Sequence, residues 1–168
     1  GIYWNGRGTS VNDLEVGNVF ENNVFRDFYY MGMYYHYGRD MQINNNDLAS
    51  SGGRVQSYGM YFRYMDYANE IIGNRFVSNT FYYGIYLDDC DGTPDEHLLF
   101  AINFMYLGRT SGRAWTYYIS DNNYLKFYYN TGVANSNSTD SRALYKVSTG
   151  TSTRFLNNNF ANLGGGYA

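Results

Sequence analysis

Apolar and polar positions follow one pattern that recurs about every 28 residues along this chain. The pattern reads apolar-x-x-Asn-x-apolar, and its clearest copy runs from Ile71 to Phe76. Asn stands fourth in five of six copies, and Ile102 replaces it in the other. A repeat of this length indicates one structural unit stacked on itself. Counted at a fixed period, the copies begin at Glu15, Ile43, Ile71, Leu99, Phe127 and Phe155.

A second pattern, small-apolar-Tyr, also recurs once per unit. Its tyrosines are separated by 31, 27, 25, 32 and 27 residues, so this spacing drifts while the Asn pattern keeps its period. We therefore expect loops of unequal length between the two patterns, near Ser50–Ser57, Cys90–His97, Gly108–Arg113 and Thr131–Arg142. The copies are Gly1-Ile2-Tyr3, Gly32-Met33-Tyr34, Gly59-Met60-Tyr61, Gly84-Ile85-Tyr86, Thr116-Tyr117-Tyr118 and Ala143-Leu144-Tyr145.

The apolar runs are short and are interrupted by Gly and Asn, whereas repeats built from helices need longer amphipathic runs. The 19 Gly and 21 Tyr also favour strands and turns. We therefore expect an all-β fold. It should be a parallel β-helix solenoid of about six coils with about 28 residues per coil, forming a single domain over residues 1–168.

Each repeated residue type has an expected place. Asn suits a sharp turn, because it tolerates the left-handed conformation and its amide can bond neighbouring backbone. Gly before the apolar-Tyr pair suits the start of a strand for the same conformational reason. Side chains alternate along a strand, so the apolar residue should point inward and the Tyr outward. The expected turn column is Asn18, Asn46, Asn74, Asn130 and Asn158, and the expected inward column is Phe20, Leu48, Phe76, Phe104 and Phe160.

The segment from Ile71 to Phe76, followed by Gly84-Ile85-Tyr86-Leu87, resembles a known repeat. It is similar to the right-handed parallel β-helices of the pectate-lyase-like superfamily, in the short-repeat form of many secreted bacterial proteins. The resemblance covers nearly the whole chain and implies a right-handed coil. It implies little about function, since such helices serve as enzymes, adhesins, tail spikes and passive stalks. Of the signatures that it implies for polygalacturonases, the chain has only Asp88-Asp89.

Charge and composition narrow the function classes. The net charge of −3 argues against a basic surface for binding nucleic acid. The sequence contains no run of 18 apolar residues, so no membrane span is predicted. Cys90 stands alone among acidic neighbours, which excludes an internal disulfide and disfavours the thiolate. The scarcity of lysine beside abundant Tyr, Asn, Ser and Thr favours an extracellular or cell-surface location. Asn137-Ser138-Thr139 matches the N-glycosylation pattern, although a chain rich in Asn and Ser forms such triplets by chance.

Neither end of the sequence carries a visible amphipathic segment that could cap a solenoid. Open strand edges readily pair with other strands. We therefore expect further coils, or copies of the chain, at both ends, as in a segment of a longer solenoid or a self-stacking fibre unit.

The densest acidic segment runs from Asp88 to His97. Its carboxylates could bind Ca²⁺, which prefers six to eight oxygen ligands, although their spacing does not match the calcium-loop motif. They could instead supply an acid/base pair for cleaving a glycosidic bond. A solvated acidic turn is the third reading. The candidate metal ligands are Asp88, Asp89, Asp91 and Asp95, and no residue is assigned a catalytic role.

The tyrosines of the second pattern should form one stripe on an outer face. Aromatic rings with a polar edge suit sugars or a protein partner, whereas a ladder that only stabilises the sheet is the alternative. The candidate ligand-binding residues are Tyr34, Tyr61, Tyr86, Tyr118 and Tyr145.

Two functions from different classes follow from these patterns. The first is a non-catalytic, extracellular structural or adhesive segment that contacts carbohydrate or a cell-surface protein. The second is a polysaccharide lyase or glycoside hydrolase, or a fragment of one, that uses the acids between Asp88 and Glu96.

Overall fold

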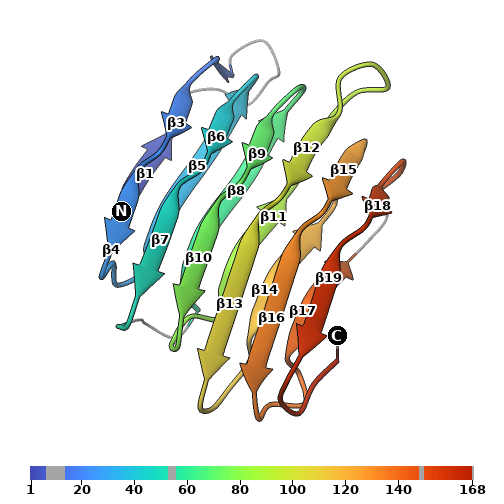
Figure 1. Ribbon diagram of the computed structural model, residues 1–168. Helices are drawn as coiled ribbons and strands as arrows, with labels where there is room; N and C mark the ends of the chain where they lie inside the picture. The colour runs from blue at the N-terminus through green and yellow to red at the C-terminus, as the bar shows by residue number, and fades with distance from the viewer. Residues whose placement is uncertain (7–13, 53–55, 148–149, 168) are drawn as a thin grey trace.

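The computed structural model describes residues 1–6, 14–52, 56–147 and 150–167. Strands in these ranges form three parallel sheets, and each coil crosses the three sheets in turn (Figure 1). The described residues contain no helix, and so none that is long and apolar enough to cross a membrane. The predicted all-β parallel β-helix of about six coils is confirmed.

The three sheets are named by the order in which the chain enters them. The first contains β1 (Ile2–Asn5), β5 (Met31–Arg39), β8 (Tyr58–Asp66), β11 (Tyr83–Asp88), β14 (Trp115–Ser120) and β17 (Arg142–Val147), with β2 (Glu15–Val16) beside the end of β5. The second contains β3 (Val19–Glu21), β6 (Gln42–Asn44), β9 (Glu70–Ile72), β12 (Leu98–Ala101), β15 (Leu125–Tyr128) and β18 (Arg154–Leu156). The third contains β4 (Val24–Arg26), β7 (Asp47–Ser50), β10 (Arg75–Ser78), β13 (Phe104–Arg109), β16 (Thr131–Ser136) and β19 (Asn159–Asn162).

The core lies inside the coil, where inward apolar side chains of each strand stack on their equivalents in the next coil. Alternation along the strands produces this arrangement, because every second side chain points to the same face. The second sheet contributes an unbroken apolar column that pairs in register from coil to coil. Its fully buried members are Ile43, Ile71, Phe100 and Phe127.

An Asn ladder joins all six coils at the turn between the second and third sheets. In each coil after the first, the Asn accepts, through Oδ1, hydrogen bonds from the backbone N–H and Nδ2 of the Asn in the preceding coil, at 2.8–3.2 Å. Its members are Asn23, Asn46, Asn74, Asn103, Asn130 and Asn158. The predicted column was wrong in two coils: Asn23 takes the place given to Asn18, and Asn103 takes the place given to Ile102. The intervals are 23, 28, 29, 27 and 28 residues, so the period is not fixed.

The predicted inward column needs the same two corrections. Phe25 and Met105 pair in register with Leu48 and Phe76, and so occupy the places expected for Phe20 and Phe104. Phe20 belongs to the second sheet, where it pairs with Ile43. The Phe104 side chain, one residue out of phase, is 37% exposed.

The left-handed residue of each turn is the one before the ladder Asn. We expected the Asn itself to adopt this conformation, and that expectation was wrong. The φ angles of these preceding residues lie between 53° and 68°, and they are Asn22, Asn45, Gly73, Ile102, Tyr129 and Asn157. The ladder Asn instead supplies hydrogen bonds between coils.

Gly in the small-apolar-Tyr pattern has a packing role rather than a conformational one. Gly32, Gly59 and Gly84 do not have positive φ. A Cβ on Gly84 would lie 2.4 Å from the Thr116 carbonyl oxygen of the next coil and 3.2 Å from Cβ of Met105, and one on Gly59 would overlap the ring of Phe76. The missing side chain therefore makes room for the large inward residue of the third sheet.

In the fifth coil, the large residue stands on the first sheet and the small residue on the third sheet, the reverse of the other coils. Thr116 replaces the Gly, the inward position holds Tyr117, and Gly132 occupies the place of Phe76. Tyr117 is fully buried, and its hydroxyl lies 3.0 Å from the carbonyl oxygens of both Asn103 and Thr131, so its one proton can be donated to either. The large side chain thus enters the core from the first sheet instead of the third.

The predicted loops are partly confirmed. Residues 90–97 connect β11 to β12 as expected. The loops predicted at Gly108–Arg113 and Thr131–Arg142 begin too early, because β13 continues to Arg109 and β16 to Ser136. The loop near Ser50–Ser57 follows β7, but its residues 53–55 lie outside the described residues.

Candidate functional site: the aromatic outer face of the first sheet

The structure places all five predicted tyrosines in one outward column on the first sheet, with Tyr3 as a sixth member. Parallel pairing brings them into register from coil to coil. From Tyr3 to Tyr118 the successive ring centroids are 4.6, 5.2, 5.0 and 4.5 Å apart, and the ring planes differ by 4–13°. The last ring, Tyr145, is tilted by 59° at 5.5 Å from Tyr118.

A second aromatic column runs beside the first and was missed from the sequence. It contains Tyr58, Tyr83 and Trp115, and the rings of Tyr58 and Tyr83 stack at 4.6 Å. Four ring pairs between the columns meet at 82–88°, so the two columns interlock in a herringbone arrangement. The signal was an aromatic residue directly before the small-apolar-Tyr triplet, as at Tyr58 and Tyr83. We call the two columns together the aromatic face.

A polar column borders the aromatic face on its other side. His36, Arg63, Asp88 and Ser120 pair in register two residues after the tyrosines. Arg63 Nε lies 3.0 Å from an Asp88 carboxylate oxygen. Burial and the neighbouring Arg63 lower the pKa of His36, so its imidazole is neutral at pH 7.

Burial keeps the central hydroxyl groups of the aromatic face protonated at neutral pH. Burial raises the pKa of Tyr61 and of Tyr83 to about 12, and it raises the pKa of Tyr34, Tyr86 and Tyr118 as well. Each hydroxyl can therefore donate and accept a hydrogen bond.

Stacking decides which part of each ring a ligand can reach. The central tyrosines are half-buried between their neighbours, whereas Tyr3 at one end is 70% exposed. The face therefore presents mainly ring edges and hydroxyl groups, and flat stacking of a ligand on the central rings is restricted.

The structure does not bring the four predicted metal ligands together. Asp88 is held by Arg63, and Asp91 Oδ1 accepts from the backbone N–H and Nδ2 of Asn123, at 2.7 and 2.9 Å. Asp89 Oδ2 lies 3.8 Å from Arg63 Nη2, while Asp95 is exposed. In the described part of the chain, no three His, Cys, Asp or Glu side chains are arranged to hold a metal ion. Calcium binding stays a prediction, which calorimetric titration with Ca²⁺ would test.

Among the described carboxyl groups, Asp66 has the largest pKa shift, although it lies outside the predicted acidic segment. Burial, followed by the nearby carboxylates of Asp91 and Asp89, raises the pKa of Asp66 to about 6. The Asp91 N–H donates to Asp66 Oδ1 at 3.2 Å. Both residues line a shallow cavity of about 170 Å³. Asp66 ends β8 as Asp88 ends β11, but the two are not in register, since Asp88 pairs with Arg63 and Asp66 with Arg39. No repeated pattern in the sequence therefore pointed to Asp66.

Cys90 is a free and fully buried thiol. Burial raises its pKa, which keeps the sulfur protonated. This agrees with the expectation that Cys90 forms no disulfide.

No family model matches the chain, and neither a curated protein nor a solved structure matches it significantly. The class of protein therefore rests on the fold alone, which is that of a parallel β-helix with an aromatic outer face.

Proposed function

We propose that this chain is a non-catalytic, extracellular or cell-surface β-helix segment whose aromatic face contacts carbohydrate or a cell-surface protein. One observation carries the proposal: two interlocked aromatic columns cover the outer face of the first sheet over successive coils. Single exposed aromatic residues are ordinary, but a contiguous aromatic patch is typical of an interaction surface.

The chemistry of the face favours carbohydrate among these partners. Its protonated hydroxyls repeat once per coil, and planar polar side chains border them at His36, Arg63 and Asp88. A glycan lying along the solenoid axis would meet the same donors and acceptors in each coil. The edges of the tyrosine rings would contact CH groups of the sugar and supply the apolar part of the interaction.

Two further properties belong to the same proposal. One is membership of the pectate-lyase-like superfamily. The other is continuation of the solenoid by further coils or by other copies of the chain, which would pair with the outermost strands β4 and β19 of the third sheet.

Tyrosine variants test the proposal, with a glycan array as the first screen. The variant Y34A/Y61A/Y86A should lose binding to the glycans retained by the parent chain while keeping its parallel-β circular dichroism spectrum. The matched variant Y34F/Y61F/Y86F keeps the stack and removes only the hydroxyls, so it should fold normally and bind more weakly. Unchanged binding by both variants, together with a lower melting temperature of the Ala variant, would assign the column to sheet stability alone.

The alternative function, a polysaccharide lyase or glycoside hydrolase, has one observation in its favour. Burial raises the pKa values of the neighbouring Asp66 and Asp91, as the acid of a glycosidase requires. Release of reducing ends from a polysaccharide panel by the parent chain, abolished in D66N and D91N, would establish the alternative.

A further inference from the structure

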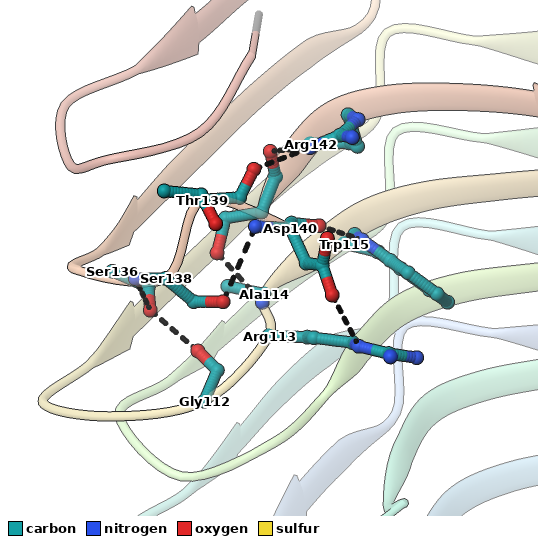
Figure 2. Close-up of polar contacts among 10 residues, drawn as sticks. Gly112, Arg113, Ala114, Trp115, Ser136, Ser138, Thr139, Asp140 and Arg142 are labelled. Carbon is teal, nitrogen blue, oxygen red and sulfur yellow. Dashed lines mark hydrogen bonds and ion pairs between the residues drawn. The ribbon is translucent and has the colours of Figure 1, made fainter.

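The loop between β16 and β17, residues 137–141, is fixed by hydrogen bonds to the preceding coil (Figure 2). Ser136 Oγ donates to the carbonyl oxygen of Gly112 at 2.5 Å, and Ser141 Oγ accepts from the Ala114 N–H at 3.1 Å. Arg113 Nε donates to the Asp140 carboxylate at 3.1 Å, and the Trp115 indole N–H donates to the Asp140 carbonyl. These hydrogen bonds and the ion pair hold the loop in one conformation against the preceding coil.

The side chains of this loop fall into two groups. Ser138 Oγ accepts from the Asp140 N–H at 3.3 Å, so Ser138 serves the turn itself. Asn137 and Thr139 are exposed, and the described hydrogen bonds engage neither side chain. The loop thus turns its first and third residues toward solvent and keeps the second for its own structure.

The segment from Gly164 to Gly166 packs against the backbone of Ser136 and Asn137, while Asn137 remains exposed. The Gly165 N–H donates to the carbonyl oxygen of Ser136, and Gly164 to Gly166 carry no side chains toward the loop. A group attached to Asn137 would meet solvent instead of a wall of side chains.

We propose that Asn137 is an acceptor site for N-linked glycosylation. Asn137-Ser138-Thr139 is the only Asn-x-Ser/Thr triplet among the 168 residues. Composition alone could produce it, but the structure exposes the acceptor amide and the required hydroxyl together. Asn137 itself is not part of the aromatic face, although Asp140 of the same loop accepts a hydrogen bond from Trp115 of that face.

The reaction is a group transfer from a polyprenyl-diphosphate-linked oligosaccharide, catalysed by the transferase of a secretory pathway. A bond forms between Asn137 Nδ2 and the anomeric carbon of the first sugar. The bond from that carbon to the diphosphate oxygen breaks, the diphosphate leaves with its lipid, and the amide gives up one proton. No oxidant or reductant is needed.

The test is secretion of the full chain, carrying a secretion signal, from a eukaryotic cell line that supplies the transferase. Intact mass and peptide mapping of the secreted protein should find glycan on the peptide containing Asn137, removable by a peptide N-glycosidase. N137Q and T139A should abolish the modification, whereas T139S and the matched exposed variant N135Q should keep it.

A secreted and folded parent chain with Asn137 unmodified would overturn the proposal. So would glycan that persists in N137Q. Failure of this test leaves glycan binding by the aromatic face unaffected, because an enzymatically deglycosylated or bacterially produced chain can still be assayed for binding.

Discussion

The residue before each ladder Asn has a left-handed backbone, and the six coils differ in how well their residue suits it. Asn and Gly tolerate positive φ, and they occupy four of these positions. Ile102 at φ 58° and Tyr129 at φ 54° do not belong to these types. A β-branched residue is the least suited, since its Cβ substituents crowd the preceding carbonyl.

We predict that I102N stabilises the protein by about 1 kcal/mol, because the left-handed conformation costs an ordinary residue about 1–2 kcal/mol. Ile102 is 63% exposed, so little packing is lost. Chemical denaturation of the two chains measures the difference. The control V24N changes an equally exposed apolar residue in a strand and should give no gain. A destabilised I102N chain would show that its backbone strain is relieved in another way.

The exchange of sizes in the fifth coil makes a second residue-scale prediction. A Cβ on Gly132 would lie 2.5 Å from Thr116 Oγ1 and 2.9 Å from the Tyr117 ring. G132F alone should therefore overpack the core and destabilise by about 1–3 kcal/mol, while Y117I alone should leave a cavity costing about 2–4 kcal/mol.

The triple variant T116G/Y117I/G132F restores the arrangement of the other coils. It should recover most of the stability lost by the single variants, as a thermodynamic cycle of unfolding free energies would show. Additive losses of unfolding free energy would mean that residues 117 and 132 do not fill the same space in the core.

At the scale of the strands and turns, the Asn ladder sets the register of the solenoid. Asn74 Nδ2 donates to the Ile43 carbonyl at 2.6 Å, and Asn74 Oδ1 accepts from the Asn46 N–H at 3.0 Å. These backbone groups are buried, so each needs a partner inside the protein. The ladder thus satisfies the turn where neither sheet supplies hydrogen bonds.

We predict that N74A destabilises the protein by about 3 kcal/mol, since it leaves two buried backbone groups unpaired at about 1–3 kcal/mol each. The exposed N135A should change stability by less than about 0.5 kcal/mol. Urea unfolding measures both. Equal effects of the two substitutions would refute the structural role of the ladder.

The presence of these strands and turns could be predicted from the sequence better than the residue at which each one begins. The recurrence of Asn and Tyr was sufficient to infer strands, coils and the outward Tyr column, because hydrogen bonds and ring stacking between coils favour the same residue type at the same place in each coil. A fixed period could not locate Asn23 or Asn103, since the first interval is five residues shorter and the third one residue longer than 28. Coil lengths change in the turns and loops, where hydrophobic alternation gives no signal.

At the scale of the whole molecule, burial raises the pKa values of several carboxyl groups near the first sheet, and this changes how stability responds to pH. The pKa of Asp66 is raised from 3.8 to about 6 in the folded state, mainly by burial. Between these values the folded chain binds more protons than the unfolded chain, so stability falls as pH rises from about 4 to about 6. Asp88 and Asp91 shift in the same direction, and Asp47, held by Arg75 and Arg26, shifts in the opposite one.

D66N isolates the contribution of Asp66 from the other carboxylates. Its amide oxygen can still accept from the Asp91 N–H. We predict that D66N is more stable than the parent at pH 7 by about 1 kcal/mol, a value discounted for partial solvent exposure, and that the difference disappears below about pH 4. Unfolding free energies at both pH values test this. A difference that does not vary with pH would place its origin in packing.

The candidate site could be predicted only in part at this scale. Recurrence in sequence revealed the Tyr column, but the herringbone contact with Tyr58 and Tyr83 depends on how two neighbouring columns tilt in space. Burial raises the pKa of Asp66, and the carboxylates of Asp91 and Asp89 in the next coil add to this shift. No local pattern in the sequence contains such relations.

The most direct measurement of the central claim is a titration of the ¹³C-tyrosine-labelled chain with a glycan selected from the array, followed by NMR. The account predicts that ring signals of Tyr34, Tyr61 and Tyr86 shift in a saturable manner, whereas those of the buried Tyr35 and Tyr117 do not. Saturable shifts confined to tyrosines outside the aromatic face, such as Tyr128 or Tyr129, would contradict it.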